Sequence, residues 1–272
     1  MSPRPRQIHR RAFSLIELTV VIGIIVIMTV LLVPAMTNLK SAGDVTSAAY
    51  TIKGVLDRAR THAMANNTYT WVGFFEENIN SPSSAVAGNG RLVLSVVASK
   101  DGTNVYGTAT SGTIDATKLT QIGKLIKIDN IHLPLLAVGS GTGIGDTFDT
   151  RPAVQSDPTA GYNYSRFGEL NAGTPNTAPY TTPFNFQYPV GNPTPSAQYT
   201  FKKLLQFDPR GESRVSGDTY DVRRVVEIGL LQTHGNVVPT PVSGGGSTAT
   251  YSGNVAALQI SGFSGDVKIY RK

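Results

Sequence analysis

The chain has 272 residues, of which 40% are hydrophobic and 15% are charged. That length provides for one large domain or two smaller ones with a sizeable core, and the composition excludes a disordered chain and a membrane protein with many spans. The chain contains no cysteine, so disulfides, thiolate nucleophiles and cysteine-ligated metal sites are excluded.

The basic character of the chain is concentrated at its N-terminus. The formal net charge is +6, and four of the cations are Arg4, Arg6, Arg10 and Arg11. Without these four the chain carries only +2. Net charge therefore gives little support to a nucleic-acid partner.

An apolar segment follows the arginines. Residues 13–33 contain a single charged residue, Glu17. As a helix with a rise of about 1.5 Å per residue, this segment would be roughly 30 Å long, the thickness of the hydrocarbon core of a bilayer. We therefore predict a transmembrane helix at 13–33, with the arginines in the cytoplasm and the rest of the chain outside it. The alternative is a secretory signal peptide, cleaved after the small residues around Pro34.

The start of this segment resembles a known processing site. The sequence RRAFSLIEL at residues 10–18 is similar to the cleavage site of type IV prepilins and type II secretion pseudopilins. The resemblance implies a leader peptide at 1–12, cleavage by prepilin peptidase between Ala12 and Phe13, and N-methylation of Phe13. The family usually has glycine where this chain has Ala12.

The same resemblance implies a role for Glu17. It would be the fifth residue of the processed chain, where its carboxylate would pair with the amino terminus of a neighbouring subunit and fix the stagger of a filament. Such a pairing is strong where water is excluded. The alternative is an uncleaved anchor whose Glu17 reaches the membrane surface.

The helix is expected to continue to about residue 67. Pro34 should bend it, because proline removes a backbone donor. Residues 34–67 are predicted to form its extracytoplasmic, amphipathic half, which ends at Asn66 and Asn67. The apolar stripe expected to pack on a sheet consists of Val45, Ala49, Ile52, Leu56, Ala59 and Ala63.

The remainder, residues 68–272, is predicted to be an antiparallel β domain, which gives an α+β, pilin-like fold with a long N-terminal helix packed on the sheet. Candidate strands lie at 68–75, 91–98, 125–128, 184–188, 199–207, 222–231, 255–260 and 266–271. The segment 139–196 is rich in Pro, Thr and Gly and is predicted to be a surface insertion. The alternative for this insertion is a recognition surface built from Tyr162, Tyr164, Phe167, Tyr180, Phe184, Phe186 and Tyr188.

Short motifs suggest a subfamily. The stretch at 56–66 and the sequences LQFDPRG at 205–211, VVEIG at 225–229, ALQI at 257–260 and SGDV at 264–267 resemble the end of the helix and the closing strands of the GspH/FimT-type minor pseudopilins.

The sequence shows little sign of catalysis, and we expect no enzyme, no cofactor and no metal centre. Its four histidines, His9, His62, His132 and His234, are scattered singly and form no metal-binding pair. The aspartate pairs Asp146 with Asp149 and Asp218 with Asp221 have a spacing that calcium ligands also show, although surface turns are the commoner explanation.

The predicted function is therefore structural: a minor pseudopilin or pilin subunit of a type II secretion or type IV pilus-like filament. The resemblance implies other subunits, prepilin peptidase, an inner-membrane assembly platform and the inner membrane as partners. It also implies a single-pass protein of the bacterial inner membrane, and a periplasmic or extracellular filament after assembly. One alternative is a minor pilin that binds DNA for uptake through Lys268, Arg271 and Lys272, and the other is an uncleaved or secreted binding protein.

Overall fold

A computed structural model describes most of the chain. The described residues are 15–83, 87–106, 109, 111–154, 184–215, 224–244 and 250–272, and the side chains of 30–43 are outside this description. The chain divides into two compact units, Met1–Ala42 and Gly43–Lys272. Helix α1 (Leu15–Ala65) contributes residues to both units.

In the second unit, α1 buries the predicted apolar stripe. The side chains of Val45, Ala49, Ile52, Leu56, Ala59 and Ala63 are all buried. The helix ends where the sequence predicts, because Asn67 adopts a left-handed backbone with φ 48° and the Asn66 amide donates to the His62 carbonyl at 3.0 Å. Asparagine tolerates this conformation better than most residues do.

The largest sheet has six strands and is antiparallel throughout. Its central pair joins β1 (Thr70–Asn78) to β2 (Gly90–Ser99) over their whole length. The other four strands are β9 (Lys203–Phe207) beside β1, β10 (Ser213–Val215) beside β9, and both β4 (Leu119–Gln121) and β5 (Ile126–Asp129) beside β2.

Two smaller sheets complete the fold. The four-stranded sheet has the order β13 (Val267–Arg271), β12 (Val255–Ser261), β11 (Val225–Gln232) and β6 (Ile131–His132). The three-stranded sheet consists of β3 (Gly112–Thr113), β7 (Phe184–Tyr188) and β8 (Tyr199–Phe201). Two short 3-10 helices, η1 (Ala116–Lys118) and η2 (Phe148–Thr150), lie in the connections.

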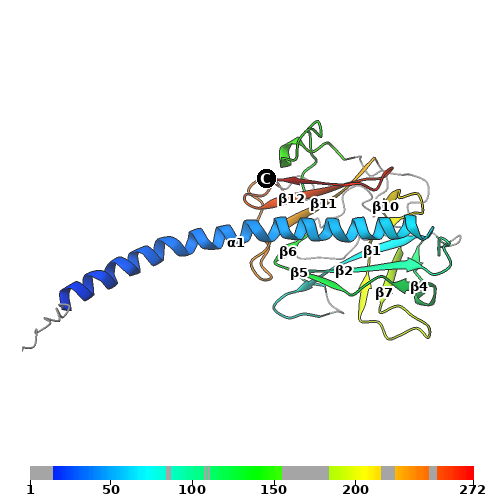
Figure 1. The fold of residues 1–272 in the computed structure, drawn as a ribbon, viewed down its shortest axis with the longest axis horizontal. Helices are drawn as coiled ribbons and strands as arrows, with labels where there is room; N and C mark the ends of the chain where they lie inside the picture. Colours follow the sequence, from blue (N-terminus) through cyan, green and yellow to red (C-terminus); the bar gives the residue numbers. More distant parts are fainter. Residues whose placement is uncertain are drawn as a thin grey trace, which may run out of the picture. The chain divides into compact units, whose positions relative to one another are not determined.

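Two hydrophobic cores lie on opposite faces of the six-stranded sheet. The first contains residues of α1 together with residues of both larger sheets, such as Val72 and Ile228, and Figure 1 shows the second half of α1 running between β11 and β12 on one side and β1 and β2 on the other. The second core is aromatic, with Trp71, Phe186 and Phe201, and the three-stranded sheet covers it. The alternating side chains of β1 therefore enter different cores.

The structure corrects the expected fold class of α+β with a helix packed on one antiparallel sheet. The described residues form thirteen strands in three sheets, so β-structure dominates. One pair of strands, β3 and β7, is parallel. The prediction failed because the strands between the two cores are apolar on both faces, and because strands of two or three residues carry too little periodicity to be recognised.

The structure also corrects the membrane prediction. Among the described residues, none of the helices combines the length and the apolar character that crossing a membrane requires. The predicted transmembrane helix at 13–33 and the single-pass location in the inner membrane are therefore wrong.

Part of the predicted insertion at 139–196 belongs to the fold. Phe184 and Phe186 lie on β7 and are buried in the second core, so they are not part of an exposed recognition surface. Tyr188 is partly buried against the same core. The other aromatic residues assigned to that surface, at 162, 164, 167 and 180, lie outside the described residues.

Candidate functional site

The first part of α1, residues 15–29, exposes apolar side chains around its whole circumference. Eleven large hydrophobic residues in this segment are between 50% and 81% exposed. They are Leu15, Ile16, Leu18, Val20, Val21, Ile22, Ile24, Ile25, Val26, Ile27 and Met28. A helix that is hydrophobic on every side is normally buried, and soluble monomers rarely expose so large a continuous apolar surface. This segment is therefore a candidate assembly surface.

The processing residues taken from the resemblance are only partly visible. Ala12 and Phe13 lie outside the described residues. Glu17 is in the first turn of α1, within the exposed apolar segment. Pro34 falls within the bounds of the helix, but in the stretch whose side chains are not described, so the expected bend stays a prediction.

A second candidate is a polar cleft of about 590 Å³ at the C-terminal end of α1. It forms where the last turn of the helix meets the end of β2 and the edge of β4. Its lining consists of His62, Asn66, Asn67, Thr68, Ser99, Lys100, Asp101, Gly102 and Thr120, and we call it the α1 cleft. Its lining contains no Trp, Tyr or Phe, and His62 supplies its one aromatic ring. Sequence reasoning missed this site because its residues come from three separate segments and match no motif.

Asp101 is the negative charge of the α1 cleft. Its Oδ1 atom accepts hydrogen bonds from the Thr103 hydroxyl at 2.7 Å, from the Thr103 backbone N–H at 3.0 Å and from the Ser99 hydroxyl at 2.8 Å. These bonds, the Thr103 hydroxyl first, lower the pKa of Asp101 to about 2. The carboxylate is therefore ionised at any physiological pH.

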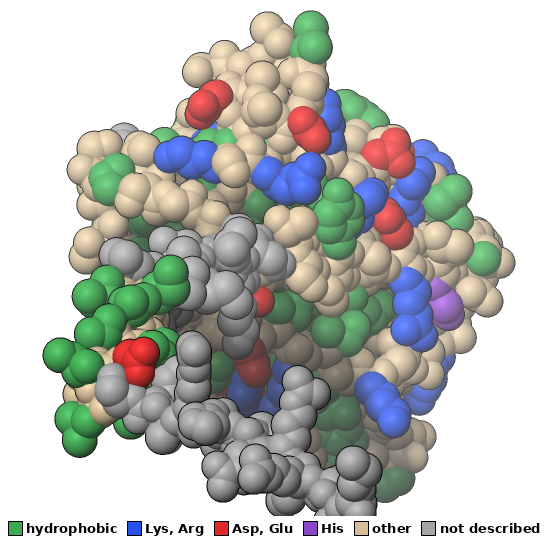
Figure 2. All heavy atoms as spheres, turned by 60° about the vertical axis from the view of Figure 1, so that its left-hand side comes forward, with side chains coloured by type: hydrophobic (Ala, Val, Ile, Leu, Met, Phe, Trp, Pro, Cys, Tyr) green, Lys and Arg blue, Asp and Glu red, His purple; other side chains and the backbone are tan. Residues whose placement is uncertain are grey.

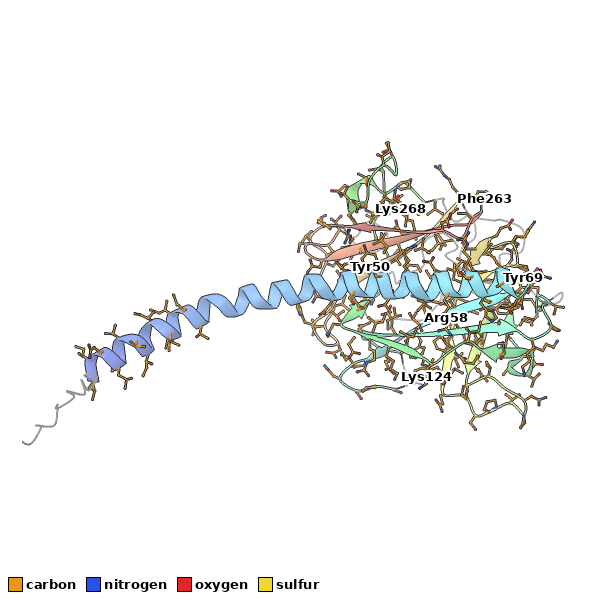
Figure 3. All side chains as sticks on the ribbon, viewed as in Figure 1. Tyr50, Arg58, Tyr69, Lys124, Phe263 and Lys268 are labelled. Atoms are coloured by element: carbon orange, nitrogen blue, oxygen red, sulfur yellow. The ribbon has the colours of Figure 1, made fainter. Side chains whose placement is uncertain are left out.

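Two cations lie beside the α1 cleft. Arg58 is one helical turn before His62, on the same side of α1. Its guanidinium covers Gly123, because a methyl group built on that glycine would lie 3.0 Å from the Arg58 Nη1 atom. Lys124 follows Gly123 in the turn between β4 and β5. Figure 3 shows Arg58 and Lys124 on the same side of α1.

Two consecutive carboxylates on β1 are buried, one on each face of the sheet. The Glu76 Oε2 atom lies 2.7 Å from His132 Nδ1, and Glu76 Oε1 accepts the Leu133 N–H at 2.9 Å. Glu77 contacts Lys127 Nζ at 3.1 Å and the Tyr199 hydroxyl at 3.1 Å. A buried carboxylate requires such partners. These groups link β1 to β6 on one face and to β5 and β8 on the other, which indicates a structural role.

The other histidines and the aspartate pairs do not come together in one site within the described residues. Of the four histidines, His9 lies outside the described residues, and His132 is in the buried pair. His234 forms a turn with Val237. Within the described ranges no group of His, Asp and Glu could hold a metal ion. Of the aspartate pairs with calcium-like spacing, Asp146 pairs with Arg271 at 3.4 Å, and residues 218 and 221 fall outside the description.

Two cations near the C-terminus, Lys268 and Lys272, donate hydrogen bonds to backbone carbonyls of the same chain. Lys268 Nζ donates to the Gly143 carbonyl at 2.6 Å, and Lys272 Nζ donates to the Tyr251 carbonyl at 2.9 Å. On the face drawn in Figure 2, Lys and Arg side chains are mixed with Asp and Glu. That face therefore has no extended positive potential. A surface that binds nucleic acid usually has one.

No protein-family model, no curated protein and no solved structure matches the chain.

Proposed function

We propose that the chain is a structural subunit of a type II secretion or type IV pilus-like filament, and that copies assemble through residues 15–29 of α1. The observation that carries this proposal is the exposed apolar surface of that segment. Burying eleven such side chains against neighbouring copies is worth on the order of 10 kcal/mol per copy. Identical segments can cover one another by the packing of ridges into grooves.

The N-terminal motif supports the same proposal. Cleavage by prepilin peptidase between Ala12 and Phe13 would remove the four arginines and place a free, methylated amino terminus next to the apolar segment. Glu17 would then neutralise the amino terminus of an adjacent copy. A carboxylate and an ammonium group attract each other strongly where neighbouring helices exclude water, so this pair would set the stagger between copies.

The processing step is tested by measuring the intact mass of the chain isolated from its own cells. The expected mass is that of a chain that begins at N-methylated Phe13. A chain that retains Met1, or one that begins at Met36 after signal-peptide cleavage, contradicts the proposal.

The assembly surface is tested with introduced cysteines, because the chain has none of its own. A variant with Leu18→Cys and Ile25→Cys, two residues seven apart on one helical stripe, should give a ladder of disulfide-linked oligomers in cells. Phe263→Cys is the control, since Phe263 is at least as exposed as Leu18 and Ile25 but lies in the β domain. Monomers alone from the Leu18 and Ile25 variant would show that these segments do not meet.

The role of Glu17 is tested with Glu17→Ala. We expect incorporation into filaments to be lost while the monomer level is unchanged. Thr19→Ala serves as the control, because its hydroxyl donates only to the Ile16 carbonyl of the same helix. Normal incorporation of the Glu17 variant would remove its proposed role.

A further inference from the structure

The α1 cleft and the two cations beside it form one continuous polar surface. Arg58, His62 and Asn66 are four residues apart and therefore share one side of α1. Thr120 of β4 lines the cleft with His62 and Asn66, and Gly123, three residues further on, contacts Arg58. The surface thus extends from the last turn of the helix to the turn between β4 and β5.

The polar groups of the α1 cleft have unused hydrogen-bonding capacity. In the part of the chain that the structure describes, the Asn67 amide and the Thr120 hydroxyl have no hydrogen-bond partner, and the Asn66 amide uses only its NH₂ group. Amides and hydroxyls both donate and accept. They suit a ligand that presents several hydroxyl groups.

The two cations add a preference for negative charge. Among the described residues, neither Arg58 nor Lys124 has an ion-pair partner, although many other cations of this unit are paired. Inside the cleft, the Lys100 ammonium donates to the Thr117 carbonyl at 2.7 Å, and Asp101 is held by its own loop. A planar guanidinium beside an ammonium is a suitable receptor for a carboxylate.

We propose that this surface binds an acidic polysaccharide, with sugar hydroxyls in the α1 cleft and a carboxylate at Arg58 and Lys124. Single-stranded nucleic acid fits less well, because base stacking uses the broad rings of Trp, Tyr and Phe and the lining contains none of these; its one aromatic ring is the smaller imidazole of His62. Tyr69, which follows the lining residue Thr68, stacks against Trp71 with ring centroids 6.4 Å apart. The binding proposed here does not depend on filament assembly.

The experiment measures binding of a galacturonate hexasaccharide to the full chain by calorimetry at low salt. The methyl ester of the same sugar is the uncharged control ligand. We expect the acid to bind at least about fivefold more tightly than the ester, because removing its charge removes the contacts with both cations. Raising the salt concentration should reduce this difference.

Three variants locate the site. Arg58→Ala and Lys124→Ala should each weaken binding roughly threefold, and Thr120→Val, which keeps the shape but loses the hydroxyl, should weaken binding of the acid and the ester alike. Lys268→Ala is the matched control, because it removes the same charge on the opposite side of α1 (Figure 3). All four side chains are exposed, so the variants should fold.

The outcomes separate the possibilities. Equal affinity in all variants, equal affinity for acid and ester, or no binding of the hexasaccharide overturns the proposal. Tighter binding of a DNA or RNA oligonucleotide than of the hexasaccharide, with the same loss in the Arg58 variant, also overturns it and assigns the surface to nucleic acid.

Discussion

The buried ion pair between Arg151 and Glu227 gives a quantitative test of the fold. The Arg151 Nε atom lies 3.2 Å from Glu227 Oε2, and the two side chains are only 5% and 2% exposed. Gln259 donates to the same carboxylate oxygen at 2.8 Å. The Arg151 guanidinium also covers the ring of Phe148, 3.8 Å from its centroid. The pair joins the segment that follows η2, in which Arg151 lies, to β11 and β12.

Glu227→Gln keeps the size of the side chain but removes its charge. The guanidinium then stays buried beside neutral acceptors, and removing one partner of a buried pair costs about 3–5 kcal/mol. For a unit of this size, each kcal/mol lowers the melting temperature by about 2–4 °C. We therefore expect a melting temperature roughly 10 °C lower and a lower urea midpoint with an unchanged m-value.

The control is the double variant Arg151→Met with Glu227→Leu. Because it removes both charges together, it should be considerably more stable than the sum of Arg151→Met and Glu227→Leu, each measured singly, predicts. If Glu227→Gln lowered the free energy of unfolding by less than about 1 kcal/mol, this account of the pair would be refuted. Full additivity in the double variant would show that the two residues do not interact.

Three other predictions concern single residues. The hydrogen bonds from Thr103 lower the pKa of Asp101 to about 2 from 3.8, so Asp101 contributes stability that is present above about pH 4 and is lost as the pH falls toward 2. In urea titrations at several pH values, Asp101→Asn should lose less stability than the wild-type chain across that range. Gly90→Ala should cost about 1–3 kcal/mol by the same measurement, because Gly90 has a φ of 100° that a side chain disfavours. Tyr199→Phe removes the hydroxyl that contacts Glu77 and should cost about 1.5–3 kcal/mol by thermal unfolding.

The sequence predicts those parts of the fold that have a regular period. The stripe from Val45 to Ala63 has helical spacing over several turns and is buried as expected. The longer strands, such as 91–98 and 255–260, also lie within observed strands. In these elements the pattern repeats over enough residues to distinguish a helix or a strand from the alternatives.

The layering of the sheets could not be predicted in this way. The strand β1 is apolar on both faces because Trp71 and Val72 enter different cores, and alternation alone cannot reveal what covers each face. The two charged residues at its end, Glu76 and Glu77, gave no indication of burial, since their partners on β5, β6 and β8 are between 50 and 122 residues away along the chain. Long-range pairs of this kind become visible only when the chain is folded.

The candidate sites also differ in how far the sequence alone reveals them. The N-terminal motif and the apolar segment are continuous in sequence, and the sequence alone identifies them. The α1 cleft depends on side chains from the end of α1, the end of β2 and β4, and no short pattern links Asn66, Asp101 and Thr120.

The adjacent carboxylates of β1 have a consequence for how the sheet finds its alignment during folding. If β1 shifted by one position against β2, Glu77 would occupy the place beside His132 and Asn78 would take the place of Glu77 beside Lys127 and Tyr199. Glu76 would then move into the place of Phe75 in the second core. Every apolar side chain of the strand would also change faces. The two acids thus favour a single alignment of β1, because a misaligned strand loses the partners of both carboxylates, one on each face of the sheet.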